Sequence, residues 1–150
     1  MKKHLKVSAI KDGTVIDHIP AERLFDVIKI LQLDNCKHQI TFGTNLESKK
    51  LNKKAIIKIS GRFFEPEEID KISLIAHQAT INIIKDYQVV EKKLVQIPDS
   101  INGIVKCFNP MCITNHEKVM PRFSVVSKEP LELKCYYCEK ITDEAHIEIL

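Results

Sequence analysis

Four cysteines in the last third of the chain are the residues whose type and spacing most clearly predict chemistry. Cys107 and Cys112 are spaced C-x4-C, and Cys135 and Cys138 follow as C-x2-C after twenty-two residues. Zinc prefers four soft ligands at tetrahedral corners about 2.3 Å away, and loops of two to four residues let two sulfurs reach one ion. The spacing therefore predicts a structural Zn(Cys)4 site with one Zn2+ per chain.

Two disulfides and a redox-active C-x-x-C are the alternative interpretations. Disulfides need an oxidising compartment, and the opening Met-Lys-Lys-His-Leu-Lys has no apolar run typical of a secretory signal, so we expect a reduced, cytoplasmic chain. A redox-active C-x-x-C begins a helix, whereas Cys135 follows a strand-like segment. His116 lies four residues after Cys112 and is expected to be a loop residue because four thiolates are already in place. Cys36 is expected to be a free thiol.

Four thiolates leave zinc no open coordination position for a reactive water, so the predicted site does not catalyse a reaction. We expect it to stabilise a surface that binds a partner. From Leu94 to Leu150 there are six Lys or Arg against eight Asp or Glu, a net charge of −2. The phosphate backbone of a nucleic acid is negative and binds positively charged protein surfaces. The negative net charge of this segment therefore favours a protein partner over nucleic acid. A stand-alone zinc-ribbon nucleic-acid binder and a free-standing ligand sensor remain the alternative functions.

The rest of the chain divides at a break in apolar periodicity. The composition, 44% hydrophobic and 29% charged, is ordinary for a soluble protein, and no stretch is apolar enough to span a membrane. Residues 1 to 93 carry seventeen Lys or Arg against twelve Asp or Glu, a net of +5. We therefore predict two domains of opposite charge, residues 1–95 and 96–150.

Local patterns predict an α+β fold for the first domain: a ferredoxin-like antiparallel sheet with two helices on one face, in the order β-α-β-β-α-β with an added strand. A small all-β zinc-binding domain follows. A lysine-rich hairpin loop is expected at Glu47–Lys54, and a tight turn at Lys85–Asp86. Strands are expected at Leu5–Ile10, Gln39–Leu46, Ala55–Ser60, Ala79–Ile84 and Tyr87–Leu94, an extended segment at Val15–Ile19, and helices at Ala21–Leu33 and from Pro66 onward.

Lysines of the first domain are its candidate anion ligands. Lys49, Lys50 and Lys53 are expected only to solubilise a loop, whereas Lys58 stands inside the apolar strand Ile56-Ile57-Lys58-Ile59. Only four glycines are present, and no glycine-rich phosphate cradle occurs, so side chains and strand-end amides would have to meet any phosphate. The sequence shows no nucleophile paired with a base.

Several of these segments carry a family resemblance. Gly13-Thr14-Val15-Ile16-Asp17-His18-Ile19-Pro20 resembles the opening of the regulatory chain of aspartate carbamoyltransferase. Ile40-Thr41-Phe42-Gly43-Thr44-Asn45-Leu46, Gln78-Ala79-Thr80-Ile81-Asn82, Tyr87-Gln88-Val89-Val90-Glu91-Lys92 and Cys135-Tyr136-Tyr137-Cys138-Glu139-Lys140 are similar to its later segments, in order. The resemblance spans nearly the whole chain and includes the cysteine spacing.

The resemblance implies a non-catalytic subunit of pyrimidine biosynthesis that binds CTP, ATP and possibly UTP. It also implies regulatory homodimers that join catalytic trimers into a dodecamer through the zinc domain. The implied nucleotide-binding residues are Ala9, Ile10, Asp17, His18, Lys54, Lys58, Asn82, Tyr87, Val89 and Lys92, and the implied contacts to the catalytic chain are Asn109 and Glu139. Phe108 and Met111 depart from the family pattern in the docking loop.

Overall fold

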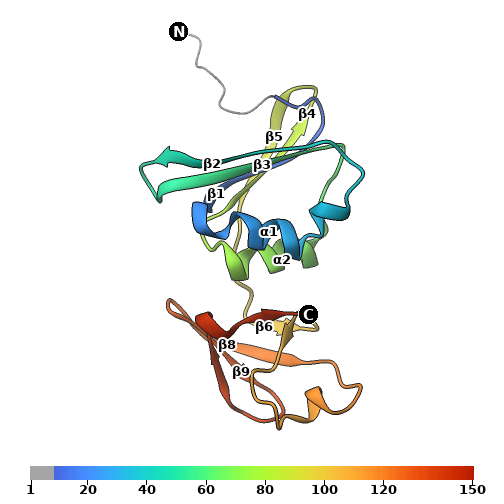
Figure 1. The fold of residues 1–150 in the computed structure, drawn as a ribbon, viewed down its shortest axis with the longest axis vertical. Helices are drawn as coiled ribbons and strands as arrows, with labels where there is room; N and C mark the ends of the chain where they lie inside the picture. Colours follow the sequence, from blue (N-terminus) through green and yellow to red (C-terminus); the bar gives the residue numbers. More distant parts are fainter. Residues whose placement is uncertain (1–8) are drawn as a thin grey trace. The chain divides into compact units, whose positions relative to one another are not determined.

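A computed structural model describes residues 9–150 of the chain (Figure 1). The chain forms two compact units, one that ends at Gln96 and one that runs from Ile97 to Leu150. None of the helices in the described part of the chain is long and apolar enough to cross a membrane.

The first unit is a five-stranded sheet in which every neighbouring pair of strands is antiparallel. The strand order is β2-β3-β1-β4-β5, so the first four strands have the arrangement expected for a ferredoxin-like sandwich, and β5 is the added strand. The elements are β1 (Gly13–Pro20), α1 (Leu24–Ile30), β2 (Ile40–Ser48), β3 (Asn52–Ser60), α2 (Pro66–Ile75), β4 (Thr80–Lys85) and β5 (Gln88–Leu94). The predicted fold class is confirmed.

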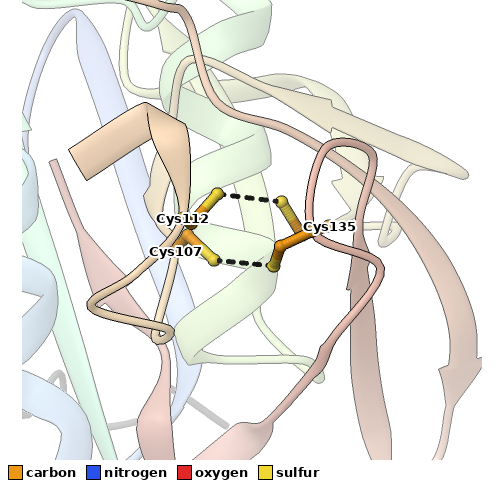
Figure 2. A group of neighbouring side chains, drawn as sticks. Cys107, Cys112 and Cys135 are labelled. Carbon is orange, nitrogen blue, oxygen red and sulfur yellow. Dashed lines mark hydrogen bonds between the residues drawn. The ribbon is translucent and has the colours of Figure 1, made fainter. Parts of the chain in front are cut away.

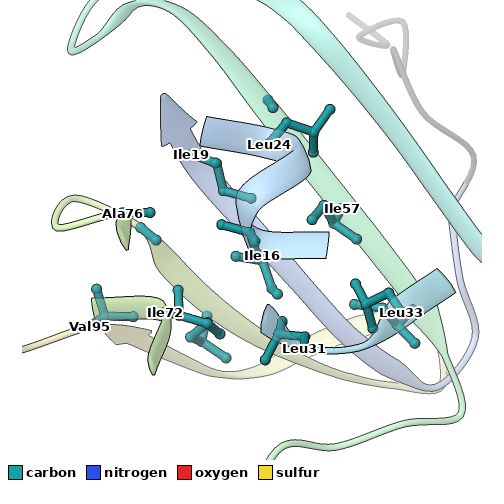
Figure 3. Close-up of a cluster of buried hydrophobic side chains, with 14 residues drawn as sticks. Ile16, Ile19, Leu24, Leu31, Leu33, Ile57, Ile72, Ala76 and Val95 are labelled. Atoms are coloured by element: carbon teal, nitrogen blue, oxygen red, sulfur yellow. The ribbon is translucent and has the colours of Figure 1, made fainter. Parts of the chain in front are cut away.

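The two faces of this sheet differ because side chains alternate along each strand. Ile16 and Ile57 are fully buried on the face covered by both helices, which contribute Leu24 and Ile72 to the same cluster (Figure 3). Ile81 is a fully buried member of this cluster as well. Burying each such side chain contributes roughly 1.5 to 3 kcal/mol. The core therefore lies between helices and sheet, and the opposite face of the sheet is left for other contacts.

The sequence predicted where the helices begin more accurately than where they end. Glu65, directly before Pro66, and Glu68 in the first turn form a capping box, and α2 begins at the predicted proline. The predicted helix Ala21–Leu33 is wrong in extent: it comprises a 3-10 turn at Ala21–Arg23, a short α1, and a second 3-10 turn at Leu33–Asn35. Gln32 has left-handed backbone (φ 55°), which separates α1 from the second 3-10 turn.

One strand prediction and one loop prediction differ from the structure in the residues that it describes. Most of the predicted strand Leu5–Ile10 lies outside the described residues, and its last two residues belong to no strand. The predicted loop Glu47–Lys54 is only a short turn, because Leu46 pairs with Lys54 and Ser48 with Asn52 in the β2–β3 ladder. A run of exposed lysines suggests a loop in the sequence, but strand pairing joins backbone groups and does not depend on these side chains.

The turn between β4 and β5 lies one residue later than predicted. Asp86 and Tyr87 both have positive φ (50° and 66°), as the two central residues of a tight hairpin turn require.

The second unit is a small antiparallel β structure, as predicted. Its strands are β6 (Ser100–Asn102), β7 (Val105–Lys106), β8 (Arg122–Lys128), β9 (Leu131–Cys135), β10 (Ile141–Asp143) and β11 (Glu148–Ile149). β10-β9-β8-β6 form one sheet and β11-β7 a second pair. Its core is small, with Ile101, Phe123, Leu131 and Leu133 nearly or fully buried.

Candidate functional site

The four predicted metal ligands come together in the second unit. The Sγ atoms of Cys107 and Cys138 lie 3.6 Å apart, those of Cys112 and Cys135 lie 3.7 Å apart, and all four lie within 4.8 Å of one another (Figure 2). A tetrahedron with bonds of 2.3 Å has edges of about 3.8 Å. The donor set therefore fits a four-coordinate thiophilic metal ion.

Two turns bring these sulfurs together. Cys135 ends β9, and a turn carries the chain to Cys138, where the Glu139 N–H donates back to the Cys135 carbonyl (3.0 Å). We call the two cysteine loops knuckles: the first is residues 107–112 and the second is residues 135–138. In the first knuckle the Cys112 N–H donates to the Asn109 carbonyl (3.0 Å). His116 donates from Nε2 to the Pro110 carbonyl oxygen (2.8 Å) and does not belong to the sulfur cluster.

The electrostatics of the cluster favour a cation. Burial raises the pKa of the Cys107 thiol, and the neighbouring thiols raise it further. Burial also raises the pKa of Cys135. Burial acts in the same direction at Cys138, but donors that include the Lys140 N–H and the Asn109 side chain outweigh it and lower that pKa to about 7. A bound cation would stabilise the buried thiolates, so metal binding releases protons.

A second candidate site lies on the face of the first unit's sheet that the helices do not cover. A pocket of about 330 Å³ is lined by residues of the segment before β1, of β1, β3, β4 and β5, and of the β4–β5 turn. Six of the ten predicted nucleotide-binding residues line it: Ala9, Ile10, Lys58, Asn82, Tyr87 and Val89. Val15, Ile56 and Ile84 complete the lining and were not predicted.

Strand register aligns the polar residues of this face. Val15 on β1 pairs with Lys58 on β3 and with Asn82 on β4, and Asn82 pairs in turn with Lys92 on β5. One row across four strands therefore runs from Lys58 to Lys92. Three strand spacings of about 4.8 Å separate the two backbones by about 14 Å. Two lysine side chains can reach one extended polyanion above the middle of this row.

Asp17 organises the positive charges next to this row. Its carboxylate forms a 2.9 Å ion pair with Lys54 Nζ and accepts the His18 N–H at 2.6 Å. Burial lowers the pKa of Lys58, and Asp17 opposes this shift. The predicted residues Asp17, Lys54 and Lys58 thus act on one another, although of these three only Lys58 lines the pocket.

His18 lies at an irregularity in β1, where the pairing register shifts and its own φ is 59°. Its Nδ1 is 3.2 Å from Thr80 Oγ1. Burial lowers the pKa of His18, Asp17 opposes this, and Lys54, Lys50 and Lys92 add to the lowering. Three lysines therefore contribute to the electrostatic field at this imidazole together with Asp17, and one of them, Lys50, was assigned only to a solvated loop by the sequence.

The two residues implied in docking lie beside the metal cluster. Asn109 accepts the Met111 N–H at Oδ1 (3.0 Å), and Glu139 has left-handed backbone (φ 64°) directly after a ligand. Glu139 also lines a groove of about 380 Å³ on the second unit with Arg122, Lys134 and Tyr136 among others. Phe108 is exposed and its ring packs against His146 with centroids 4.4 Å apart.

Sequence reasoning missed two side chains of the first knuckle. Thr114 donates from Oγ1 to Cys112 Sγ, and the Asn115 amide bonds to the knuckle backbone. Their position two and three residues after a ligand was the available signal.

Comparison with known proteins agrees with this geometry. A family model described as aspartate carbamoyltransferase regulatory chain, allosteric domain, matches residues 5–96, and the corresponding metal binding domain matches residues 99–148. The aspartate carbamoyltransferase regulatory chain of Bacteroides thetaiotaomicron is 53% identical over 149 residues, 99% of this chain and 97% of that one. The chain of the same name from Pyrococcus furiosus is 54% identical over 145 residues, 95% of both chains.

An allosteric α+β domain followed by a four-cysteine metal-binding domain defines a regulatory chain that is not itself catalytic. The chain belongs to the family of aspartate carbamoyltransferase regulatory chains.

Proposed function

We propose that the chain binds CTP and ATP, with UTP as a further candidate, as allosteric effectors of a cytoplasmic aspartate carbamoyltransferase. In this proposal residues 1–95 take the nucleotide, and residues 96–150 hold Zn2+ and dock on the catalytic chain. Regulatory homodimers then link catalytic trimers into a dodecamer. The observation that carries the proposal is the single pocket lined by six of the residues implied by the family resemblance.

The pocket and the residues beside it offer each part of a nucleotide a suitable partner. Tyr87 and Val89 are largely exposed, at 68% and 58%, and supply apolar surface for a base beside the backbone of Ala9 and Ile10. A carboxylate such as Asp17 accepts hydrogen bonds from ribose hydroxyls. Lysine ammonium groups at the two ends of the strand row supply charge-assisted hydrogen bonds to phosphates.

His18 and Lys54 would face the phosphate end of the same ligand. The ion pair of Lys54 with Asp17 holds this ammonium near the strand row, and Lys92 adds its field at His18. The unit is also the basic half of the chain, which attracts an anion from a distance.

Zinc is the metal that we assign to the four cysteines. The sulfur separations of 3.6 and 3.7 Å match tetrahedral Zn–S geometry, although iron also accepts four thiolates. All four positions are taken by protein, so the ion would cross-link the two knuckles and supply no reactive water. Asn109 and Glu139, held next to this cross-link, are the proposed contacts to the catalytic chain.

Calorimetry on the full regulatory chain tests the effector site with three lysine variants. We expect Lys58→Ala and Lys92→Ala each to cost on the order of 1.5 to 3 kcal/mol of CTP or ATP affinity, about 10- to 150-fold, because each removes a hydrogen bond to a charged group. Lys49→Ala is the matched control, since Lys49 lies exposed in the β2–β3 turn, and its affinity should be unchanged.

Two results would contradict the proposal. Equal losses at all three lysines would indicate diffuse attraction in place of a site. A wild-type chain that binds neither nucleotide would remove the effector function altogether.

A further inference from the structure

The first knuckle is held closed by a side chain that follows it. Asn115 donates from Nδ2 to the carbonyl oxygens of Cys107 (3.1 Å) and Asn109 (2.7 Å). A carboxamide nitrogen carries two hydrogens, so one side chain satisfies both acceptors. Asn115 thereby ties the start of the knuckle to the 3-10 turn η3 (Ile113–Asn115), which directly follows the second ligand, Cys112.

Thr114, in the same turn, contacts a ligand sulfur directly. Its Oγ1 donates to Cys112 Sγ at 3.2 Å. Thr114 is half-buried and Cys112 is only 2% exposed, so this bond is partly shielded from water. Once a metal has converted Cys112 to a thiolate, the hydroxyl bond becomes charge-assisted and therefore stronger.

The other three sulfurs receive donors from the backbone. The Asn109 N–H bonds to Cys107, the Tyr137 and Cys138 N–H groups bond to Cys135, and the Lys140 N–H bonds to Cys138. Backbone donors are the same for nearly any residue at those positions. The hydroxyl at Cys112 depends on the identity of Thr114, and Cys138 receives a side-chain donor from Asn109 in addition to its backbone donor, so a single substitution can remove a donor at either of these two sulfurs.

We propose that Thr114 and Asn115 are positioning residues for the metal. Thr114 stabilises the Cys112 thiolate by its hydroxyl hydrogen bond, and Asn115 keeps the C-x4-C knuckle closed, so that together they slow metal loss. Opening this knuckle is the step that exposes Cys112 to a competing chelator. The inference rests on the proposed zinc, and deepens it by naming the residues that retain the ion.

The test measures zinc release from the full zinc-loaded chain to an excess of a colorimetric chelator. Outer-shell partners of metal ligands typically change metal affinity 10- to 100-fold. We expect Thr114→Val, which keeps the shape and removes the hydroxyl, to release zinc about 10-fold faster, and Asn115→Leu up to about 100-fold faster. Thr114→Ser should release at close to the wild-type rate because it keeps the donor.

Ser127→Ala is the matched control. The Ser127 hydroxyl, like that of Thr114, donates a hydrogen bond, but its acceptor is the Pro130 carbonyl (2.6 Å). Ser127 lies at the end of the β8–β9 hairpin that is remote from Cys135. Its release rate should equal the wild type. In Co2+-substituted protein, Thr114→Val should shift the thiolate-to-metal charge-transfer band to longer wavelength, because a thiolate without the hydrogen bond is a stronger donor. Ser127→Ala should leave the band in place.

The outcomes separate the two claims. If elemental analysis finds no zinc in the wild-type chain, the proposed zinc fails and this inference fails with it. If zinc is present but Thr114→Val and Ser127→Ala release it at the wild-type rate, only the inference is overturned. If Thr114→Val cannot be purified with metal, retention in Thr114→Ser supports the role of the hydroxyl, and loss in both variants overturns it.

Discussion

Removal of the metal should unfold the second unit and leave the first folded. In the first unit Ile16, Ile57, Ile72 and Ile81 are fully buried between helices and sheet, which gives it a core of its own. The second unit has few large buried side chains, and the sulfur cluster joins its two knuckles. The metal should therefore be the main cross-link that holds residues from about 97 onward together.

The magnitude follows from the size of that unit. Domains have about 0.05 to 0.15 kcal/mol of stability per residue, which for Ile97–Leu150 is about 3 to 8 kcal/mol with the metal bound. Structural zinc in comparable peptides contributes roughly 10 to 16 kcal/mol near neutral pH. Because the second figure exceeds the first, the unit without metal should be more stable unfolded than folded.

Hydrogen exchange followed by mass spectrometry checks this before and after chelation. Peptides that cover β8 and β9 should lose protection when zinc is stripped and regain it when zinc returns, whereas peptides from β1, β3 and β4 should not change. Cys36→Ser serves as a control, since Cys36 lies in the first unit, and should alter neither metal content nor exchange. Persistent protection in β8 and β9 at negligible metal content would refute the reasoning.

Two further predictions concern pH and assembly. Burial lowers the pKa of His18 in the folded chain. As pH falls, the unfolded chain, in which the pKa of a histidine is about 6.5, therefore takes up the proton first. The stability of the first unit should consequently decline from about pH 6.5 downward. His18→Asn, which tolerates the positive φ at this position, should show a smaller decline in denaturant titrations, and an identical pH dependence would contradict the assignment. Mercurial displacement of the four thiolates should release catalytic trimers and regulatory dimers, as seen by size-exclusion chromatography. Catalytic trimers that stay bound after the metal is lost would place the docking surface elsewhere. Separately, Glu139→Ala should weaken assembly without loss of nucleotide affinity.

Local signals in the sequence were sufficient for the metal cluster and most elements. The spacing of Cys107, Cys112, Cys135 and Cys138 predicted the cluster because short knuckles restrict where two sulfurs can point. Pro66 with its acidic neighbours marked the start of α2 because capping depends on residues within one turn.

Strand boundaries were less predictable where the side chains are exposed. Lys54 was assigned to a loop but pairs with Leu46 on β2 and with Pro20 on β1. Ladder hydrogen bonds join backbone groups, so a charged residue can occupy a strand whenever its side chain reaches water. Hydrophobic patterns do not report such pairing.

The tertiary structure alone decided which polar groups meet. Alternation assigns Lys58 and Lys92 to a face of the sheet, but only the register across β3, β1, β4 and β5 places them in one row. The ion pair of Asp17 with Lys54 likewise joins residues on different strands. Register is fixed by packing of the whole core, in which a slip of one residue would turn every buried isoleucine to the other face. These contacts are therefore properties of the folded sheet and not of any segment of the sequence.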